Sequence, residues 1–80
     1  MKHPERVLQG LGRALQEARD KRGLTQESLS LETGVHRNYI GGIERGERSP
    51  SVEAIIKLAA ALDVSLADLF GRAEGHTPAK

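Results

Sequence analysis

The sequence predicts an all-α protein in which five short helices form one compact domain. Its 80 residues are enough for a single small hydrophobic core. Apolar residues recur at steps of three and four along most of the chain, which is the period of a helix buried on one side. Glycines and hydroxyl-bearing residues that end or begin helices separate these stretches, and no stretch predicts a strand.

The first helix is predicted from Glu5 to Lys21 by an amphipathic stripe. Gly23 then serves as its C-terminal cap, because glycine readily adopts the left-handed conformation that ends many helices. The residues of the stripe are Leu8, Leu11, Leu15 and Ala18.

Two short helices joined by a sharp turn are predicted next. Thr25 caps the second helix, which ends at Gly34, and the third helix runs from about His36 to Gly46. Gly34 tolerates the positive φ that such a turn requires. This is the spacing of a helix-turn-helix motif.

Two further helices complete a domain that we expect to span residues 1–71. Ser51 caps the fourth helix, and Ser65 caps a short fifth helix. Residues 72–80 are polar and predict a flexible C-terminal tail. The fourth helix is expected to turn its apolar residues inward: Val52, Ile55, Leu58, Ala59 and Leu62.

Composition excludes several classes of function. Cysteine is absent and the three histidines are scattered, so we expect no disulfide, no metal site and no cofactor. No apolar run is long enough to span a bilayer and no signal peptide is evident, so we expect a cytoplasmic protein with no membrane partner. No arrangement of side chains predicts an enzyme. The net charge of +1 is low for a nucleic-acid-binding protein, so DNA binding would depend on where a few charges point.

Several motifs together resemble the XRE-type helix-turn-helix family, which includes Cro-like phage repressors. They are GLTQESL at residues 23–29, the turn at Gly34 and Val35, YIGGIERGERSPS at 39–51, and the stretch IIKLAAALDVSLADLF. The resemblance implies a five-helix, lambda-repressor-like DNA-binding domain that regulates transcription as a homodimer on a two-fold symmetric operator. Among small stand-alone members, the chain is similar to restriction-modification controller proteins, phage regulators and antitoxins.

The resemblance also implies DNA contacts at the start of two helices. Gln26 would contact a phosphate and brace the recognition helix. His36 is expected to cap that helix, where Ser, Thr or Asp are commoner, and this departure leaves open that His36 also touches DNA. Arg37, Asn38 and Tyr39 would reach base edges, a thymine methyl group or a phosphate, unless they are ordinary surface residues.

The end of the third helix and the following loop complete the expected interface. Gly41 and Gly42 are unusual inside a helix, and we expect one to allow tight packing and the other to allow close approach to DNA. In similar proteins the position of Gly42 often carries a side chain that helps to read bases, which this chain lacks. Arg45 and Arg48 would contact phosphates, unless the neighbouring glutamates neutralise them.

Two further groups are expected to organise the protein. By resemblance, Arg19 and Glu44 form a structural ion pair between the first and third helices. The fifth helix carries more apolar residues than its own packing requires, which predicts a dimer interface unless these residues cap the core. The expected interface residues are Leu66, Leu69 and Phe70.

The sequence therefore predicts a sequence-specific regulator whose partners are double-stranded DNA and a second copy of itself, without a small-molecule ligand. The alternative is a protein-interaction module that uses the same fold for coactivator bridging or antitoxin-like binding, because a fold does not by itself imply DNA recognition. The near-neutral charge favours the alternative. Arg37 and Asn38 on the exposed face of the third helix favour DNA.

Overall fold

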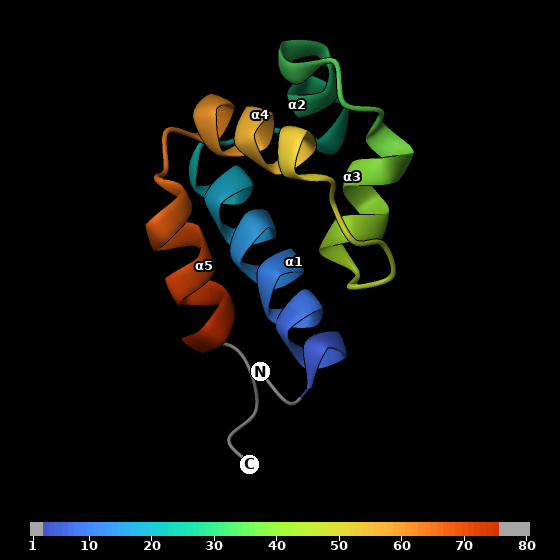
Figure 1. Cartoon of the computed structure of the whole chain (residues 1–80). Helices are drawn as coiled ribbons and strands as arrows, with labels where there is room; N and C mark the ends of the chain where they lie inside the picture. The colour runs from blue at the N-terminus through green and yellow to red at the C-terminus, as the bar shows by residue number, and fades with distance from the viewer. Residues whose placement is uncertain (1–2, 76–80) are drawn as a thin grey trace.

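The computed structural model describes residues 3–75, and within this range the chain forms five helices and no strand. The helices are α1 (Pro4–Lys21), α2 (Gln26–Thr33), α3 (Arg37–Glu44), α4 (Val52–Leu62) and α5 (Leu66–Gly75). α1 runs through the middle of the domain between α3 and α5, while α2 and α4 lie at one end (Figure 1). The prediction of an all-α fold with five helices is confirmed.

Hydroxyl side chains accept the hydrogen bonds that fix where three of the helices begin. The hydroxyl oxygen of Thr25 accepts a hydrogen bond from the backbone N–H of Ser28, which caps α2. Ser51 and Ser65 cap α4 and α5 in the same way, each through the backbone N–H three residues ahead. The turn between α2 and α3 depends on Gly34, whose φ of 77° is left-handed.

The end of α5 differs from the sequence prediction. The helix does not stop at residue 71 but continues to Gly75. Ala73 is fully buried in the core, and this packing offsets the low helix propensity of Gly71. The boundary between domain and tail was therefore placed too early, and residues 76–80 of the expected tail lie outside the described residues.

The core receives large side chains from every helix. Val52, which was expected to face inward, is instead exposed at the first turn of α4. Each fully buried aliphatic side chain contributes about 1.5–3 kcal/mol of hydrophobic stabilisation, so all five helices are tied to one core. The largest fully buried side chains are Leu15, Leu29, Ile40, Ile43, Leu58 and Leu69.

α1 and α3 approach so closely at Gly12 that no side chain fits there. A Cβ atom on residue 12 would lie less than 3.0 Å from the carbonyl oxygens of Ile43 and Glu44. Because these are backbone atoms of α3, they cannot move aside without shifting the helix. Gly12 therefore sets the distance between the two helices.

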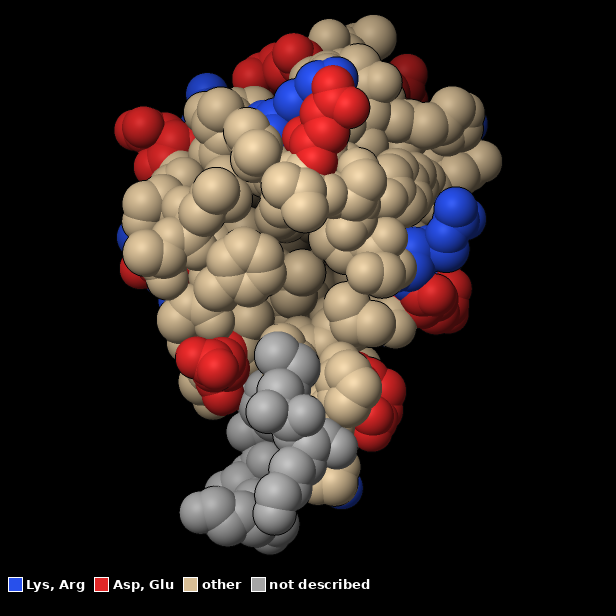
Figure 2. All heavy atoms as spheres, in the orientation of Figure 1, with Lys and Arg blue, Asp and Glu red and all other residues tan. Residues whose placement is uncertain are grey.

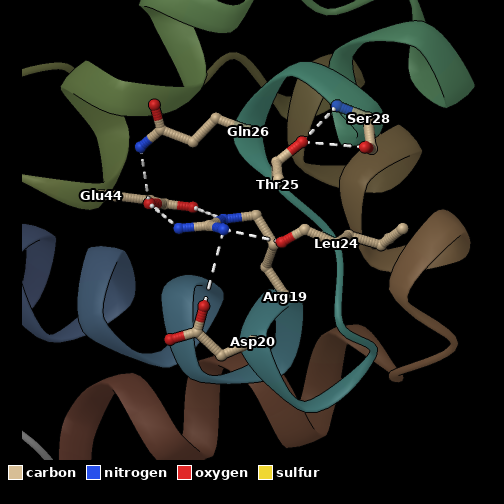
Figure 3. Close-up of polar contacts among 7 residues, drawn as sticks. All are labelled: Arg19, Asp20, Leu24, Thr25, Gln26, Ser28 and Glu44. Carbon is tan, nitrogen blue, oxygen red and sulfur yellow. Dashed lines mark hydrogen bonds and ion pairs between the residues drawn. The ribbon is translucent and has the colours of Figure 1, made fainter.

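A buried ion pair joins the same two helices near the other end of α1 (Figure 3). The Nε and Nη2 atoms of Arg19 donate to the two carboxylate oxygens of Glu44, at 2.7 and 3.0 Å. Nη1 of Arg19 also donates to the carbonyl oxygen of Leu24, at 2.7 Å. The side chains of Arg19 and Glu44 are only 11% and 4% exposed, so this two-point contact is shielded from water.

The pair also holds the charge of the guanidinium group. The hydrogen bond to Glu44 raises the pKa of Arg19 and outweighs the opposing effect of burial. A raised arginine pKa stabilises the fold at every pH below its ordinary value, and the stabilisation is lost only as the pH rises through the raised value. The contact therefore persists throughout the physiological range.

We expect Gly12→Ala to destabilise the domain by about 1–3 kcal/mol or more, because the added methyl group forces α1 away from α3. Thermal or urea unfolding measures the effect. The matched control is Gly71→Ala in α5, where a Cβ atom would meet nothing within 4 Å. The control should be neutral or stabilising by up to about 1 kcal/mol. Equal stabilities for the two variants would contradict the close contact.

We expect Arg19→Ala to lower the free energy of unfolding by about 3 kcal/mol or more, because Glu44 is left buried without its cation. Arg72→Ala is the control, since it breaks an exposed ion pair with Asp68 within α5 and should cost less than about 0.5 kcal/mol. An unchanged melting midpoint for Arg19→Ala would show that the pair does not hold the fold.

Candidate nucleic-acid interface

The first residue of α2 is attached to the Arg19–Glu44 pair. The side-chain nitrogen of Gln26 donates to Oε1 of Glu44 at 2.9 Å, which links α2 to the end of α3 (Figure 3). Its amide lies beside the backbone of α3 at Gly41. Gln26 therefore braces α3 in this structure, and its position at the N-terminus of α2 is one where backbone N–H groups attract phosphate.

α3 begins with a histidine cap. The Nδ1 atom of His36 accepts a hydrogen bond from the backbone N–H of Asn38 at 3.1 Å. This arrangement requires the ring to carry its proton on Nε2, which leaves an exposed N–H donor at the edge of the helix. His36 thus fixes the first turn of α3 and also offers a hydrogen bond to an external acceptor.

The first two residues of α3 are exposed and only weakly held. The guanidinium of Arg37 forms an ion pair with Glu27 of α2 at 3.3 Å, and both side chains are mostly exposed. The side chain of Asn38 is exposed and has no hydrogen-bond partner among the described residues. Exposed pairs of this kind contribute about 0–1 kcal/mol, so Arg37 can exchange Glu27 for another partner at little cost.

Tyr39 is turned toward the loop that follows α3. Its hydroxyl group donates to the carbonyl oxygen of Ser49 at 3.1 Å and accepts from the backbone N–H of Ser51 at 2.9 Å. The ring is half-buried against the core. In this structure Tyr39 therefore braces the loop and the N-terminus of α4, and its hydroxyl group is not free to read a base.

The two arginines of the loop have different partners. Nε of Arg45 pairs with the carboxylate of Glu47 at 3.0 Å, in an exposed contact. The guanidinium carbon of Arg48 lies 5.1 Å from the centre of the Tyr39 ring, which is a cation–π distance. A glutamate therefore neutralises Arg45, which is the alternative that the sequence left open. Arg48 has no carboxylate partner within the described residues.

The two glycines of α3 have different neighbours, and neither allows helix backbones to touch. A Cβ atom on Gly41 would meet the ends of the Arg45 and Gln26 side chains at 3.1 and 3.3 Å. For a Cβ atom on Gly42, the three nearest atoms all belong to the side chain of Arg48. Tight packing against α2, one of the two explanations expected from the sequence, is therefore limited to a side-chain contact at Gly41.

An apolar face lies over α1, α4 and α5 (Figure 2). Charged side chains lie mainly around its margin, and its hollow has a volume of about 310 Å³. Exposed apolar side chains on α4 and α5 continue this surface. Pro4, Val7, Leu8, Val52 and Phe70 line the hollow, and we count Ile56 and Leu66 in the apolar face because they are exposed one turn from Val52 and Phe70 on the same helices.

The expected dimer-interface residues do not share one environment. Leu66 and Phe70 are 38% and 43% exposed, but Leu69 is only 1% exposed. Leu69 points into the protomer's own core, so its assignment to an interface was wrong. Leu66 and Phe70 lie four residues apart and share one face of α5, whereas Leu69 faces the core.

Sequence reasoning missed Gly12 and the partners of several exposed side chains. Gly12 interrupts an otherwise strong amphipathic helix, and this interruption is the only signal in the sequence that could have indicated a close helix contact. The pairing of Glu27 with Arg37 depends on the angle between α2 and α3. That angle is a property of the folded chain.

Two other kinds of site were sought in the described part of the chain. Residues 3–75 contain no group of histidine, cysteine, aspartate and glutamate side chains that could hold a metal ion. Over the same range, no helix combines the length and apolar character needed to cross a membrane.

Comparison with known proteins identifies relatives of the chain. The family model described as helix-turn-helix matches residues 15–69. The control protein C.SmaI of Serratia marcescens is 43% identical over 54 residues, which cover 68% of this chain and 64% of that protein. The transcriptional regulator SlrR of Bacillus subtilis is 38% identical over 61 residues, which cover 75% of this chain and 40% of SlrR. Across four such relatives, this chain spans 40% to 66% of their lengths.

Solved structures share the same fold. The restriction-modification controller protein C.AhdI from Aeromonas hydrophila is 45% identical with a TM-score of 0.75, over 78% of this chain and 94% of that one. The controller protein C.Esp1396I, solved as a tetramer with its natural 35 base-pair operator, is 27% identical with a TM-score of 0.77, over 89% and 93% of the two chains. From the matched motif and the shared fold, we conclude that this chain belongs to the XRE-type helix-turn-helix family.

Proposed function

We propose that the protein is a sequence-specific DNA-binding transcriptional regulator that binds a two-fold symmetric operator as a homodimer. The observation that carries this proposal is the start of α3, where Arg37 and Asn38 are exposed and lack strong partners. Arginine pairs with the O6 and N7 atoms of guanine, and asparagine pairs with the N6 and N7 atoms of adenine. The C.Esp1396I controller in complex with its operator gives a precedent in a related protein.

Phosphate contacts would place this helix on the duplex. Gln26 at the N-terminus of α2 and Arg45 after α3 both lie beside Gly41, and His36 caps the first turn of α3. Contacts to DNA phosphates fix the register and orientation of a protein on the duplex, while contacts to bases carry the sequence information. Gly42 lies one turn after Asn38 and adds no side chain to this face of α3.

The low net charge is compatible with this role. Arg37 and Arg45 are each paired with an exposed glutamate, and such pairs are weak and screened by salt. A phosphate or a guanine edge can replace the glutamate. Because each arginine–glutamate pair must be broken first, the affinity for DNA of any sequence is lowered. Sequence-specific contacts then decide where the protein binds.

A second copy of the chain is the proposed partner on the apolar face. One recognition helix reads only a few base pairs, and each mismatched pair costs only about 1–3 kcal/mol, so two half-sites are needed for useful specificity. Two-fold symmetry supplies them with a single interface. Leu66 and Phe70 on α5, with Val52 and Ile56 on α4, offer exposed apolar surface for this interface.

We further propose that the protein acts by binding and not by catalysis, and in the cytoplasm together with its DNA. The runner-up is a protein-interaction module, which the near-neutral charge and the apolar face would also suit. DNA selection separates the two. Purified protein incubated with a library of random duplexes should enrich paired half-sites whose centres are about 34 Å apart. Enrichment of no sequence would favour the interaction module.

We expect Arg37→Ala to weaken binding to the selected duplex by about 1–3 kcal/mol and binding to random DNA by much less, because a base contact is lost. Fluorescence anisotropy on both duplexes at one salt concentration measures the difference. The control is Glu27→Gln, which frees Arg37 and should not weaken either interaction. Equal losses on the two duplexes for Arg37→Ala would make Arg37 a phosphate contact.

We expect Ile56→Lys and Phe70→Lys each to shift the protein from dimer to monomer, because each places a charge in the apolar face. Sedimentation velocity at micromolar concentrations measures the state. Leu31→Lys is the control, since Leu31 on α2 is 82% exposed and lies outside the apolar face. A wild-type protein that stays monomeric at high micromolar concentration, even with the selected duplex, would contradict the dimer.

A further inference from the structure

Position 42 of the recognition helix is occupied by a side chain from elsewhere in the chain. Gly42 follows Asn38 by four residues, so the two positions share one face of α3. A Cβ atom on Gly42 would come within 3.0 Å of Cγ of Arg48, and it would lie 3.3 and 3.6 Å from Cβ and Cδ of the same residue. No other atom is as close. The stem of Arg48 therefore fills the space that a side chain of residue 42 would take.

The backbone of the loop holds Arg48 in this place. The backbone N–H groups of Glu47 and Arg48 both donate to the carbonyl oxygen of Gly42, at 2.9 and 3.2 Å. Gly46, with a φ of 77°, turns the chain back over the end of α3, and its N–H donates to the carbonyl oxygen of Ile43. This is the glycine-based ending that many helices use, and here it brings the loop onto the face of Gly42.

Tyr39 orients the far end of the same side chain. Its hydroxyl group is bonded to the backbone of Ser49 and Ser51, so its ring is fixed relative to the loop. The Arg48 guanidinium lies over this ring at 5.1 Å and is not neutralised by any described carboxylate. Arg48 is thus held by packing and stacking alone, and all five of its N–H donors remain available.

We infer that Arg48 serves as a base-reading residue in place of the side chain that Gly42 lacks, and that its target is a guanine in each half-site. This inference rests on the proposed DNA-binding function. The stacked, planar guanidinium suits two-point recognition of the guanine O6 and N7 atoms, and it starts from the same helix face as Asn38. Gly42 is the specificity-determining partner, because any larger residue would displace the stem of Arg48.

The experiment is a double-mutant cycle of Gly42→Ala and Arg48→Ala on the selected duplex and on random DNA. Gly42→Ala should fold, since the atoms nearest to the added Cβ belong to the exposed side chain of Arg48, and Gly71→Ala is its folding control in a thermal melt. Each single variant should reduce the preference for the selected duplex by about fivefold or more, the lower range for one base-reading side chain. The double variant should be no worse than Arg48→Ala alone.

Arg48→Lys and a repeated DNA selection identify the role of the guanidinium. Lysine keeps the charge but loses two-point geometry and stacking, so the selected sites should lose one G·C preference per half-site and keep the others. If Arg48→Lys retains the full preference, or if Arg48→Ala weakens selected and random DNA equally, Arg48 is a phosphate contact and the inference fails. If Gly42→Ala still lowers the preference in the Arg48→Ala background, Gly42 serves close backbone approach and the inference also fails.

The same data separate this inference from the proposed function. If the wild-type protein shows a clear sequence preference but the effects of Gly42→Ala and Arg48→Ala are additive, only the role assigned to Gly42 and Arg48 is overturned. A wild-type protein without any sequence preference would overturn the proposed function and the inference together.

Discussion

The contact between α1 and α3 is the constraint on which the rest of the structure depends. Gly12 lets the backbones of the two helices meet, and the buried Arg19–Glu44 pair fixes their relative rotation. A helix of eight residues has too few internal hydrogen bonds to be stable alone, so this contact stabilises α3 and sets its orientation. The direction in which Arg37 and Asn38 point is therefore decided by contacts of α3 in the interior of the domain.

Rigid and exchangeable interactions are separated in space. Glu44 accepts hydrogen bonds from both Arg19 and Gln26 in a site closed to solvent, and removing Arg19 would leave its buried charge without a cation. At the exposed surface, Arg37 and Arg45 form ion pairs with glutamates that another anion can replace. A buried frame that supports exposed, weakly held donors suits recognition of a charged polymer, because the frame stays in place while the donors change partners.

The sequence predicted the helices well and their neighbours less well. Caps at Thr25, Ser51 and Ser65 are local in the chain, and so the starts of three helices could be predicted. The pairing of Arg19 with Glu44 came from family resemblance alone, since 25 residues separate them. The length of α5 was underestimated because Ala73 is held by tertiary packing that a polar local sequence does not indicate.

The candidate site was predicted by residue but not by role. Arg37 and Asn38 are exposed as expected, and these assignments remain predictions. Tyr39 was grouped with them because it is their neighbour in the chain, yet its hydroxyl group bonds to a loop ten residues later. Leu69 was grouped with Leu66 and Phe70 by hydrophobicity, which cannot distinguish a core residue from an interface residue three positions away. Gly42 carries no side chain, so only the folded structure can identify what fills its place.

Amide chemical-shift mapping during titration with the selected duplex tests most directly whether the buried frame presents α3 to DNA. The account predicts that the largest changes fall on the first turn of α2, the first turn of α3 and the loop at residues 45–48. The amides around Gly12 should change little, because the contact between α1 and α3 stays closed on binding. Changes centred on α4 and α5, with α3 unaffected, would contradict the account.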